Sequence, residues 1–173
     1  MTDLANPAVL IIAYRRTLEI ERILQECQEN NIKKIYVALD GPKAGDTGGE
    51  KDNKAIRELV TNYQKNYSGV ITTLFRDQNV GCAASCLSAC DWVFENEEYV
   101  IVVEDDCIPS PDFFEFARAS INALESDSNI WLACGTQFAP KDIHNDSWSL
   151  SSYALIWGWV TSRAKWKEIS SAI

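Results

Sequence analysis

Short apolar runs alternate with amphipathic stretches along most of the chain. Residues 9–13 form a continuous, mainly β-branched apolar run, which is typical of a strand covered on both faces. Thr17 can cap a helix that follows. The apolar residues of that helix have the spacing i, i+3, i+4 and i+7 of a single face; they are Ile20, Ile23, Leu24 and Cys27. The pattern predicts a strand followed by a helix that packs on the sheet.

The same alternation occurs three more times. Strands are predicted at residues 34–39, 70–75 and 99–103, and helices with apolar stripes at residues 56–67, 79–96 and 110–124. The last helix has a strong start, because Ser110 can cap it, Pro111 suits the first position and Asp112 lies near the positive end of the helix dipole. Four strand–helix pairs with short connections predict an α/β fold with a mainly parallel sheet flanked by helices.

After residue 124 the pattern becomes less regular. Residues 130–134 are predicted to form a fifth strand, residues 135–151 a polar loop, residues 153–160 an extended aromatic segment, and the last residues a helix that starts near Ser162. Extended backbone would place Trp157 and Trp159 on the same face. There they would either stack on a sugar ring or pack in the core.

Composition and charge limit the class of protein. The 173 residues are 46% hydrophobic, and no repeat or linker divides them, so residues 1–173 are predicted to form one domain. There are 25 acidic against 16 basic residues, with a formal net charge of -9 and no basic run, which argues against nucleic acid and anionic membranes as partners. No apolar run is long enough for a signal peptide or a transmembrane segment. With six scattered cysteines, expected to be reduced, this predicts a cytoplasmic protein.

Polar clusters directly follow four of the predicted strands, at residues 14–16, 40–43, 76–81 and 104–106. Parallel sheets bind ligands outside the carboxyl ends of their strands, so we expect the clusters to converge on one crevice. The last cluster is Glu104-Asp105-Asp106, whose carboxylates repel each other unless solvent, cationic side chains or a metal offsets their charge. Mg²⁺ and Mn²⁺ commonly take one or two carboxylates together with phosphate oxygens. A metal site and a solvated acidic turn are both compatible with these residues.

The order of residues around this cluster is more specific than the cluster itself. A strand, Glu-Asp-Asp, three further residues and Ser-Pro-Asp-Phe-Phe follow one another in residues 100–114. This resembles the metal-binding, DXD-like segment of GT-A glycosyltransferases, nearest to the N-acetylglucosaminyltransferase I type. Further matches along the chain are Tyr14-Arg15-Arg16, Asp40, Arg76-x-x-Asn79-x-Gly81 and Trp157-Gly158-Trp159. The resemblance implies a Rossmann-like GT-A domain that binds a nucleotide-diphospho-sugar.

The resemblance also implies roles for single residues. Asp106 would be the direct ligand of Mn²⁺ or Mg²⁺, and Glu104 and Asp105 would contact the ribose, the sugar or metal-bound water. Asp40 would accept a hydrogen bond from a uracil base. The remaining nucleotide-sugar-binding residues would be Ala13, Tyr14, Arg15, Arg76, Asn79 and Gly81. The implied reaction is a metal-dependent, inverting transfer from a UDP-sugar to a saccharide or other hydroxyl acceptor, in which a cation stabilises the departing diphosphate.

The general base and two other functions stay open at this point. The resemblance places the base in a later segment, expected beyond Ile173, so the domain would be truncated on its acceptor side and its activity alone is doubtful. Asp142 and Asp146 are the carboxylates of the 135–151 loop, and a solvated position suits them better than catalysis. A sugar-phosphate nucleotidyltransferase usually has a glycine-rich loop after its first strand, which residues 14–17 lack. The third possibility is a fragment that binds nucleotide sugar without turnover.

Overall fold

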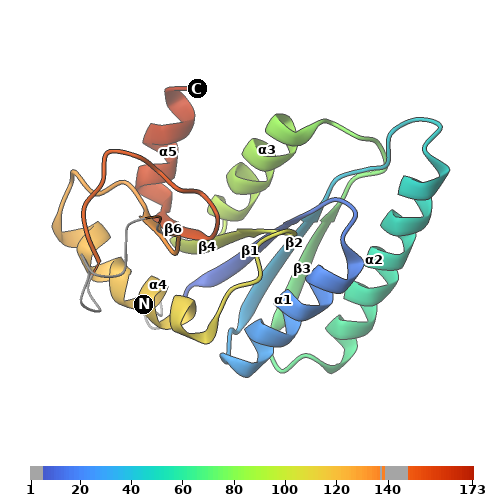
Figure 1. Cartoon of the computed structure of the whole chain (residues 1–173), viewed down its shortest axis with the longest axis horizontal. Helices are drawn as coiled ribbons and strands as arrows, with labels where there is room; N and C mark the ends of the chain where they lie inside the picture. The colour runs from blue at the N-terminus through green and yellow to red at the C-terminus, as the bar shows by residue number, and fades with distance from the viewer. Residues whose placement is uncertain (1–5, 137, 139–147) are drawn as a thin grey trace.

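A six-stranded sheet flanked by helices forms the centre of the protein (Figure 1). The computed structural model describes residues 6–136, 138 and 148–173. The strand order is β3-β2-β1-β4-β6-β5. The four parallel strands are β1 (Ala8–Ala13), β2 (Lys34–Leu39), β3 (Val70–Phe75) and β4 (Tyr99–Glu104). The strands β5 (Ala133–Cys134) and β6 (Trp159–Ser162) complete the sheet in antiparallel pairings. The predicted α/β fold with a mainly parallel sheet is confirmed.

Two hydrophobic cores lie on opposite faces of the sheet. The helices α1 (Thr17–Glu29), α2 (Thr47–Asn66) and α4 (Pro111–Ser126) pack on one face, and α3 (Cys82–Phe94) and α5 (Arg163–Ser171) pack on the other (Figure 1). Alternate side chains of β1 pack into different cores: Ile11 belongs to the first core and Leu10 to the second. Every residue of β1 is buried, which explains its unbroken apolar sequence.

Two helices begin at places that differ from the prediction. The second helix starts at Thr47 and not at residue 56, because Asp46 caps it by accepting a hydrogen bond from the Gly49 backbone N–H at 2.9 Å. The third helix starts at Cys82 and not at residue 79, because the preceding Gly81 has φ +85°. That left-handed conformation cannot continue into an α-helix.

The C-terminal strands are shorter than predicted. Of residues 130–134 only Ala133–Cys134 form a strand, and of the extended segment only the residues from Trp159 onward do. Gly158 has φ +76°, so the alternation of side chains breaks there, and the expectation that Trp157 and Trp159 share a face is wrong. Trp159 is buried in the second core, whereas Trp157 is 51% exposed. Within the described part of the chain, no helix has the length and apolar character needed to cross a bilayer.

Candidate functional site

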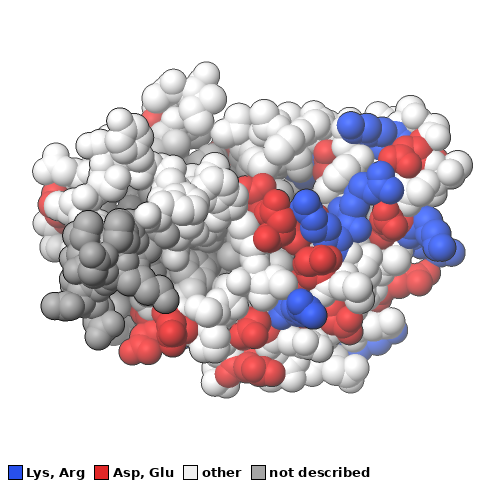
Figure 2. Space-filling view, in the orientation of Figure 1, with Lys and Arg blue, Asp and Glu red and all other residues white. Residues whose placement is uncertain are grey.

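The carboxyl ends of the parallel strands are joined by backbone hydrogen bonds just past the sheet. The Asp40 N–H donates to the Ala13 carbonyl at 3.0 Å, and the Asp105 N–H donates to the Ile12 carbonyl at 2.9 Å. Residues that follow β1, β2 and β4 are thereby brought to one edge, as the sequence predicted. Figure 2 shows acidic and basic side chains side by side on the half of the molecule that carries α1 and α2.

Asp105 holds the turn between β1 and α1. Its Oδ2 accepts hydrogen bonds from the backbone N–H groups of Tyr14, at 2.8 Å, and Arg15, at 3.2 Å. Its Oδ1 accepts a hydrogen bond from Nη1 of Arg16 at 2.8 Å. The residue is only 7% exposed. Asp105 thus has a bracing role that sequence reasoning missed, because its partners are backbone groups about ninety positions earlier in the chain.

Asp106 and Glu104, on either side of Asp105, have more open carboxylates. The side chain of Asp106 is 48% exposed, and its Oδ2 lies 3.5 Å from Nη1 of Arg16. Glu104 is half-buried at the end of β4. Burial raises the pKa of Glu104, and the negative charges of Asp106 and Asp105 raise it further, while Arg16 opposes them. The cluster therefore carries more negative charge than its own cationic neighbour offsets.

A second group of predicted residues surrounds Asp40 at the end of β2. The carboxylate of Asp40 is 4% exposed. Its Oδ1 accepts from the backbone N–H groups of Gly41, at 2.9 Å, and Val80, at 3.1 Å, and its Oδ2 accepts from Nδ2 of Asn79 at 2.9 Å. A Cβ on Gly41 would overlap the backbone of Gln78, so the two turns are in close contact. Oδ2 of Asp40 can accept one more hydrogen bond, because a carboxylate oxygen has two lone pairs.

The two arginines predicted to bind nucleotide contact the flanking helices. The guanidinium of Arg15 makes ion pairs with Asp46 and Asp52, both at 2.9 Å, at the start of α2. Nη2 of Arg76 donates to the hydroxyl of Ser88 on α3 at 2.7 Å. Both arginines therefore lie beside the strand ends, but neither guanidinium is bonded to the acidic cluster.

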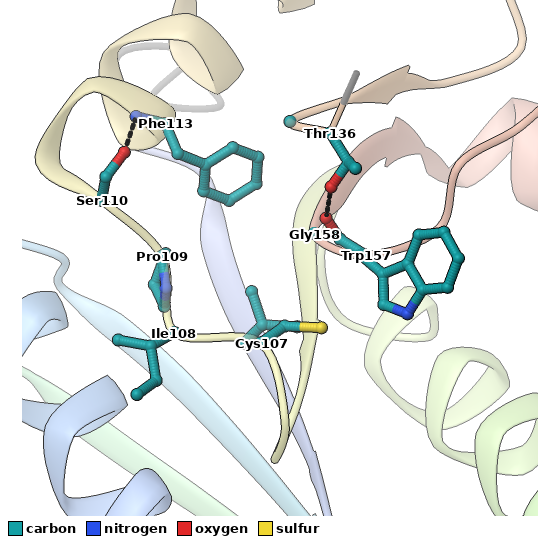
Figure 3. A pocket seen from close by; sticks show the side chains of 10 residues that line it. Cys107, Ile108, Pro109, Ser110, Phe113, Thr136, Trp157 and Gly158 are labelled. Carbon is teal, nitrogen blue, oxygen red and sulfur yellow. Dashed lines mark hydrogen bonds between the residues drawn. The ribbon is translucent and has the colours of Figure 1, made fainter. Parts of the chain in front are cut away.

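A pocket of about 190 Å³ adjoins the acidic cluster (Figure 3). It lies between the β4–α4 segment, the residues that follow β5 and the residues that lead into β6. The ring of Phe113 projects into it, with Cys107 and Trp157 at its margin (Figure 3). A hydrogen bond of 2.7 Å from Oγ1 of Thr136 to the Trp157 carbonyl holds one wall together. The lining residues are Val103, Cys107, Ile108, Pro109, Ser110, Phe113, Gly135, Thr136, Trp157 and Gly158. The sequence singled out Trp157 but did not predict this pocket.

Comparison with protein families decides the class of this protein. The GNT-I family matches residues 82–172, which run from α3 through the acidic cluster to α5 and make up more than half of the chain. The chain belongs to the GNT-I family. The GNT-I family is a glycosyltransferase family that uses nucleotide sugars, so the enzyme class and the donor class expected from the resemblance are confirmed.

Comparison with one solved structure supports the fold of this GNT-I family chain. The 4-diphosphocytidyl-2C-methyl-D-erythritol synthase from Anaerococcus prevotii is similar over 96% of this chain and 78% of its own, with 11% identity and a TM-score of 0.52. A UDP-glucose pyrophosphorylase complexed with UDP-glucose aligns over 69% of this chain and 55% of its own, with 12% identity and a TM-score of 0.42. At 11% identity, the similarity to the synthase concerns the fold alone. No curated protein matches the chain.

The resemblance of this GNT-I family chain implied a divalent metal, and the donor groups near the acidic cluster show whether one would fit. The described residues contain no cluster of three or more His, Cys, Asp or Glu side chains around one position, so there is no all-protein cage in that part of the chain. Mg²⁺ and Mn²⁺ do not need one, because substrate phosphates and water complete their coordination. An exposed carboxylate, Asp106, in a cluster with excess negative charge fits such an ion.

Most of the predicted site residues lie at the same sheet edge. Asp40 and Asn79 are hydrogen-bonded to each other, and Asp105 is bonded to the turn of residues 14–16. Direct contacts of any of these residues with a ligand remain predictions. Asp142 and Asp146 lie outside the described residues. Arg16, which the sequence placed in a motif but not in the site, joins the set through its ion pairs.

Proposed function

We propose that this GNT-I family chain binds a UDP-sugar together with Mn²⁺ or Mg²⁺ at the carboxyl ends of β1, β2 and β4. The sugar is then transferred, with inversion, to a hydroxyl of a saccharide or another acceptor. The observation that carries this proposal is the geometry of two adjacent carboxylates. Asp105 is buried and fixed by backbone donors, while Asp106 beside it is exposed and contacts one partly exposed guanidinium.

The base of the nucleotide is proposed to bind beside Asp40. Oδ2 of Asp40 faces Asn79 and has a free lone pair that suits the N3–H of uracil. Ala13 and Tyr14 on one side and the turn from Arg76 to Gly81 on the other form the walls. Because the three protein donors hold the Asp40 carboxylate still, little rotamer entropy is lost when the base binds.

The diphosphate is proposed to lie between the uracil site and the acidic cluster. Asp106 would hold the divalent cation, with Glu104 near enough to accept a hydrogen bond from cation-bound water or the sugar. A bound cation supplies positive charge to the leaving diphosphate, which is Lewis-acid assistance. Asp105 contributes by fixing the turn of residues 14–16, so that Tyr14 and Arg15 keep their positions when the nucleotide enters.

The sugar is proposed to enter the pocket next to Asp106. Its volume of about 190 Å³ suits one monosaccharide ring better than a longer chain. Phe113 and Trp157 line this pocket, and aromatic rings pack against the apolar side of a pyranose. Two further proposals concern the division of the enzyme. Residues 1–173 form the donor-binding domain, and the general base comes from a segment beyond Ile173.

The proposal is tested by calorimetric titration of UDP with and without Mn²⁺. We expect UDP binding to require the metal and to weaken more than about tenfold in Asp106→Ala, because a direct metal carboxylate is lost. Asp112→Ala is the matched control: it removes a nearby exposed carboxylate outside the cluster and should leave UDP binding unchanged. Equal UDP affinity in Asp106→Ala and the wild type would contradict the proposal.

The reaction class is tested separately by product analysis. A glycosyltransferase incubated with a UDP-sugar and a hydroxyl acceptor releases UDP, whereas a nucleotidyltransferase given pyrophosphate would form UTP. We expect UDP and no UTP. Metal-dependent UDP binding without either product would favour a nucleotide-sugar-binding domain that needs a further segment for turnover.

A further inference from the structure

Among the described residues, Arg16 is the cation bonded to the acidic cluster. It precedes α1 as the N-cap residue, and its side chain is 51% exposed. Nη1 lies 2.8 Å from Oδ1 of Asp105 and 3.5 Å from Oδ2 of Asp106. A single guanidinium nitrogen thus bridges the bracing carboxylate and the proposed metal carboxylate.

The two carboxylates depend on Arg16 to different degrees. Asp105 is also held by the N–H groups of Tyr14 and Arg15, so it keeps its position when the guanidinium moves. Among the ion pairs of the described residues, Asp106 has only the one with Arg16. Arg15 cannot replace Arg16 without leaving Asp46 and Asp52. The loosely held end of the bridge is therefore the Arg16–Asp106 contact.

We infer that Arg16 is a built-in counter-cation that competes with the divalent metal for Asp106 and is displaced when an anionic nucleotide enters. This inference rests on the proposed function. While Arg16 stays on Asp106, it reduces the negative charge available to a metal and places a positive charge beside it, and both effects weaken metal binding. An entering diphosphate provides other acceptors for the guanidinium, so Asp106 becomes free.

The consequence is that metal and nucleotide bind cooperatively. Each makes the binding of the other more favourable, and by thermodynamic linkage the coupling is the same in both directions. The contact is partly exposed, so its effect is moderate: interactions between solvent-exposed charges are worth up to roughly 1 kcal/mol, which is about a fivefold change in an equilibrium constant. Without Arg16 the metal should bind Asp106 more tightly in the absence of nucleotide, and the coupling should shrink.

The test measures Mn²⁺ affinity without nucleotide, by electron paramagnetic resonance of free Mn²⁺, and repeats the measurement with saturating UDP. In Arg16→Gln we expect the Mn²⁺ Kd without UDP to fall about two- to fivefold, and the gain in affinity caused by UDP to decrease by a similar factor. Arg163→Gln is the control. It removes the same charge near the start of β4, where Arg163 contacts Glu98 at 3.7 Å, and should change neither quantity.

The outcomes separate the inference from the proposed function. If the wild type binds no Mn²⁺ even with UDP, the proposed function fails. If the wild type binds both but Arg16→Gln binds Mn²⁺ alone no more tightly, only the inference is overturned. Arg16→Met covers the case in which the glutamine variant does not fold: it also removes the charge but keeps an apolar stem in place of the arginine stem, and its Mn²⁺ Kd without UDP should lie below that of the wild type. An unchanged or higher Kd in that variant overturns the inference too.

Discussion

Two neighbouring carboxylates, Asp105 and Asp106, should respond in opposite ways to the same substitution. Asp105→Ala removes an acceptor that is 7% exposed and binds the backbone N–H groups of Tyr14 and Arg15 and the side chain of Arg16. Asp106→Ala removes a carboxylate whose side chain is 48% exposed and whose one ion pair is 3.5 Å long. We predict that the first change mainly lowers the stability of the metal-free protein, whereas the second mainly abolishes metal-dependent UDP binding.

The size of the Asp105 effect follows from its three hydrogen bonds. Hydrogen bonds to a charged group contribute about 1.5–3 kcal/mol each when buried. The two backbone donors are only partly buried, and the Arg16 side chain is half exposed, so roughly 3–4 kcal/mol is expected for all three. Relief of repulsion from Glu104 and Asp106 returns about 1 kcal/mol across solvent. The net loss is about 2–3 kcal/mol, because the hydrogen bonds outweigh the repulsion.

Urea denaturation of metal-free protein, followed by circular dichroism, measures this loss. In a thermal melt a chain of this size loses about 2–4 °C of Tm per kcal/mol, so Asp105→Ala should melt roughly 4–12 °C below the wild type. Asp105→Asn keeps an acceptor for the backbone and should lose less than half as much. Asp106→Ala should stay within about 1 kcal/mol of the wild type. The reasoning is refuted if Asp105→Ala and Asp106→Ala have equal unfolding free energies.

Three further changes test other parts of the site. Gly41→Ala should destabilise the protein by about 1–3 kcal/mol in urea denaturation and weaken UDP binding, because its Cβ would overlap the Gln78 backbone. Glu104→Gln should raise the Tm of metal-free protein at pH 7. The folded-state pKa of Glu104 is raised, so stability falls as pH rises from the ordinary carboxyl pKa, and the variant should show a flatter Tm profile between about pH 4 and 7. Trp157→Ala should weaken binding of a UDP-sugar about three- to tenfold, from a lost aromatic contact, while calorimetry with UDP alone shows no change.

The parts of the fold that the sequence predicted well are those governed by burial on both faces. Every residue of β1 is covered by helices on each side of the sheet, so its apolar run carries the strand signal without alternation. The errors occur where single-residue backbone geometry decides. Gly81 and Gly158 have positive φ and stop regular structure one residue before a helix or strand begins. A sequence does not state which of its glycines adopts that conformation, because glycine adopts either sign of φ at similar cost.

The site was predictable in its location but not in its internal bonding. Polar residues after parallel strands must meet at one edge, and this rule places Asp40 and the acidic cluster at the same edge from the sequence alone. The division of roles between Asp105 and Asp106 was not predictable. Both are aspartates in one motif, and the difference arises from the backbone N–H groups of Tyr14 and Arg15, whose direction depends on the turn after β1.

The antiparallel direction of β6 explains how two motifs far apart in the sequence come to share one site. Val102, near the carboxyl end of β4, pairs with Trp159, which is the first residue of β6. The chain that enters β6 therefore arrives at the edge where β4 ends in its carboxylates. Trp157 and Gly158 precede that point, so they line the pocket beside Cys107. A parallel strand in the same place would enter at the opposite edge and carry Trp157 away from Asp106. The reversal of strand direction after four parallel strands is thus what brings the segment of Trp157 and the acidic cluster to the same edge of the sheet.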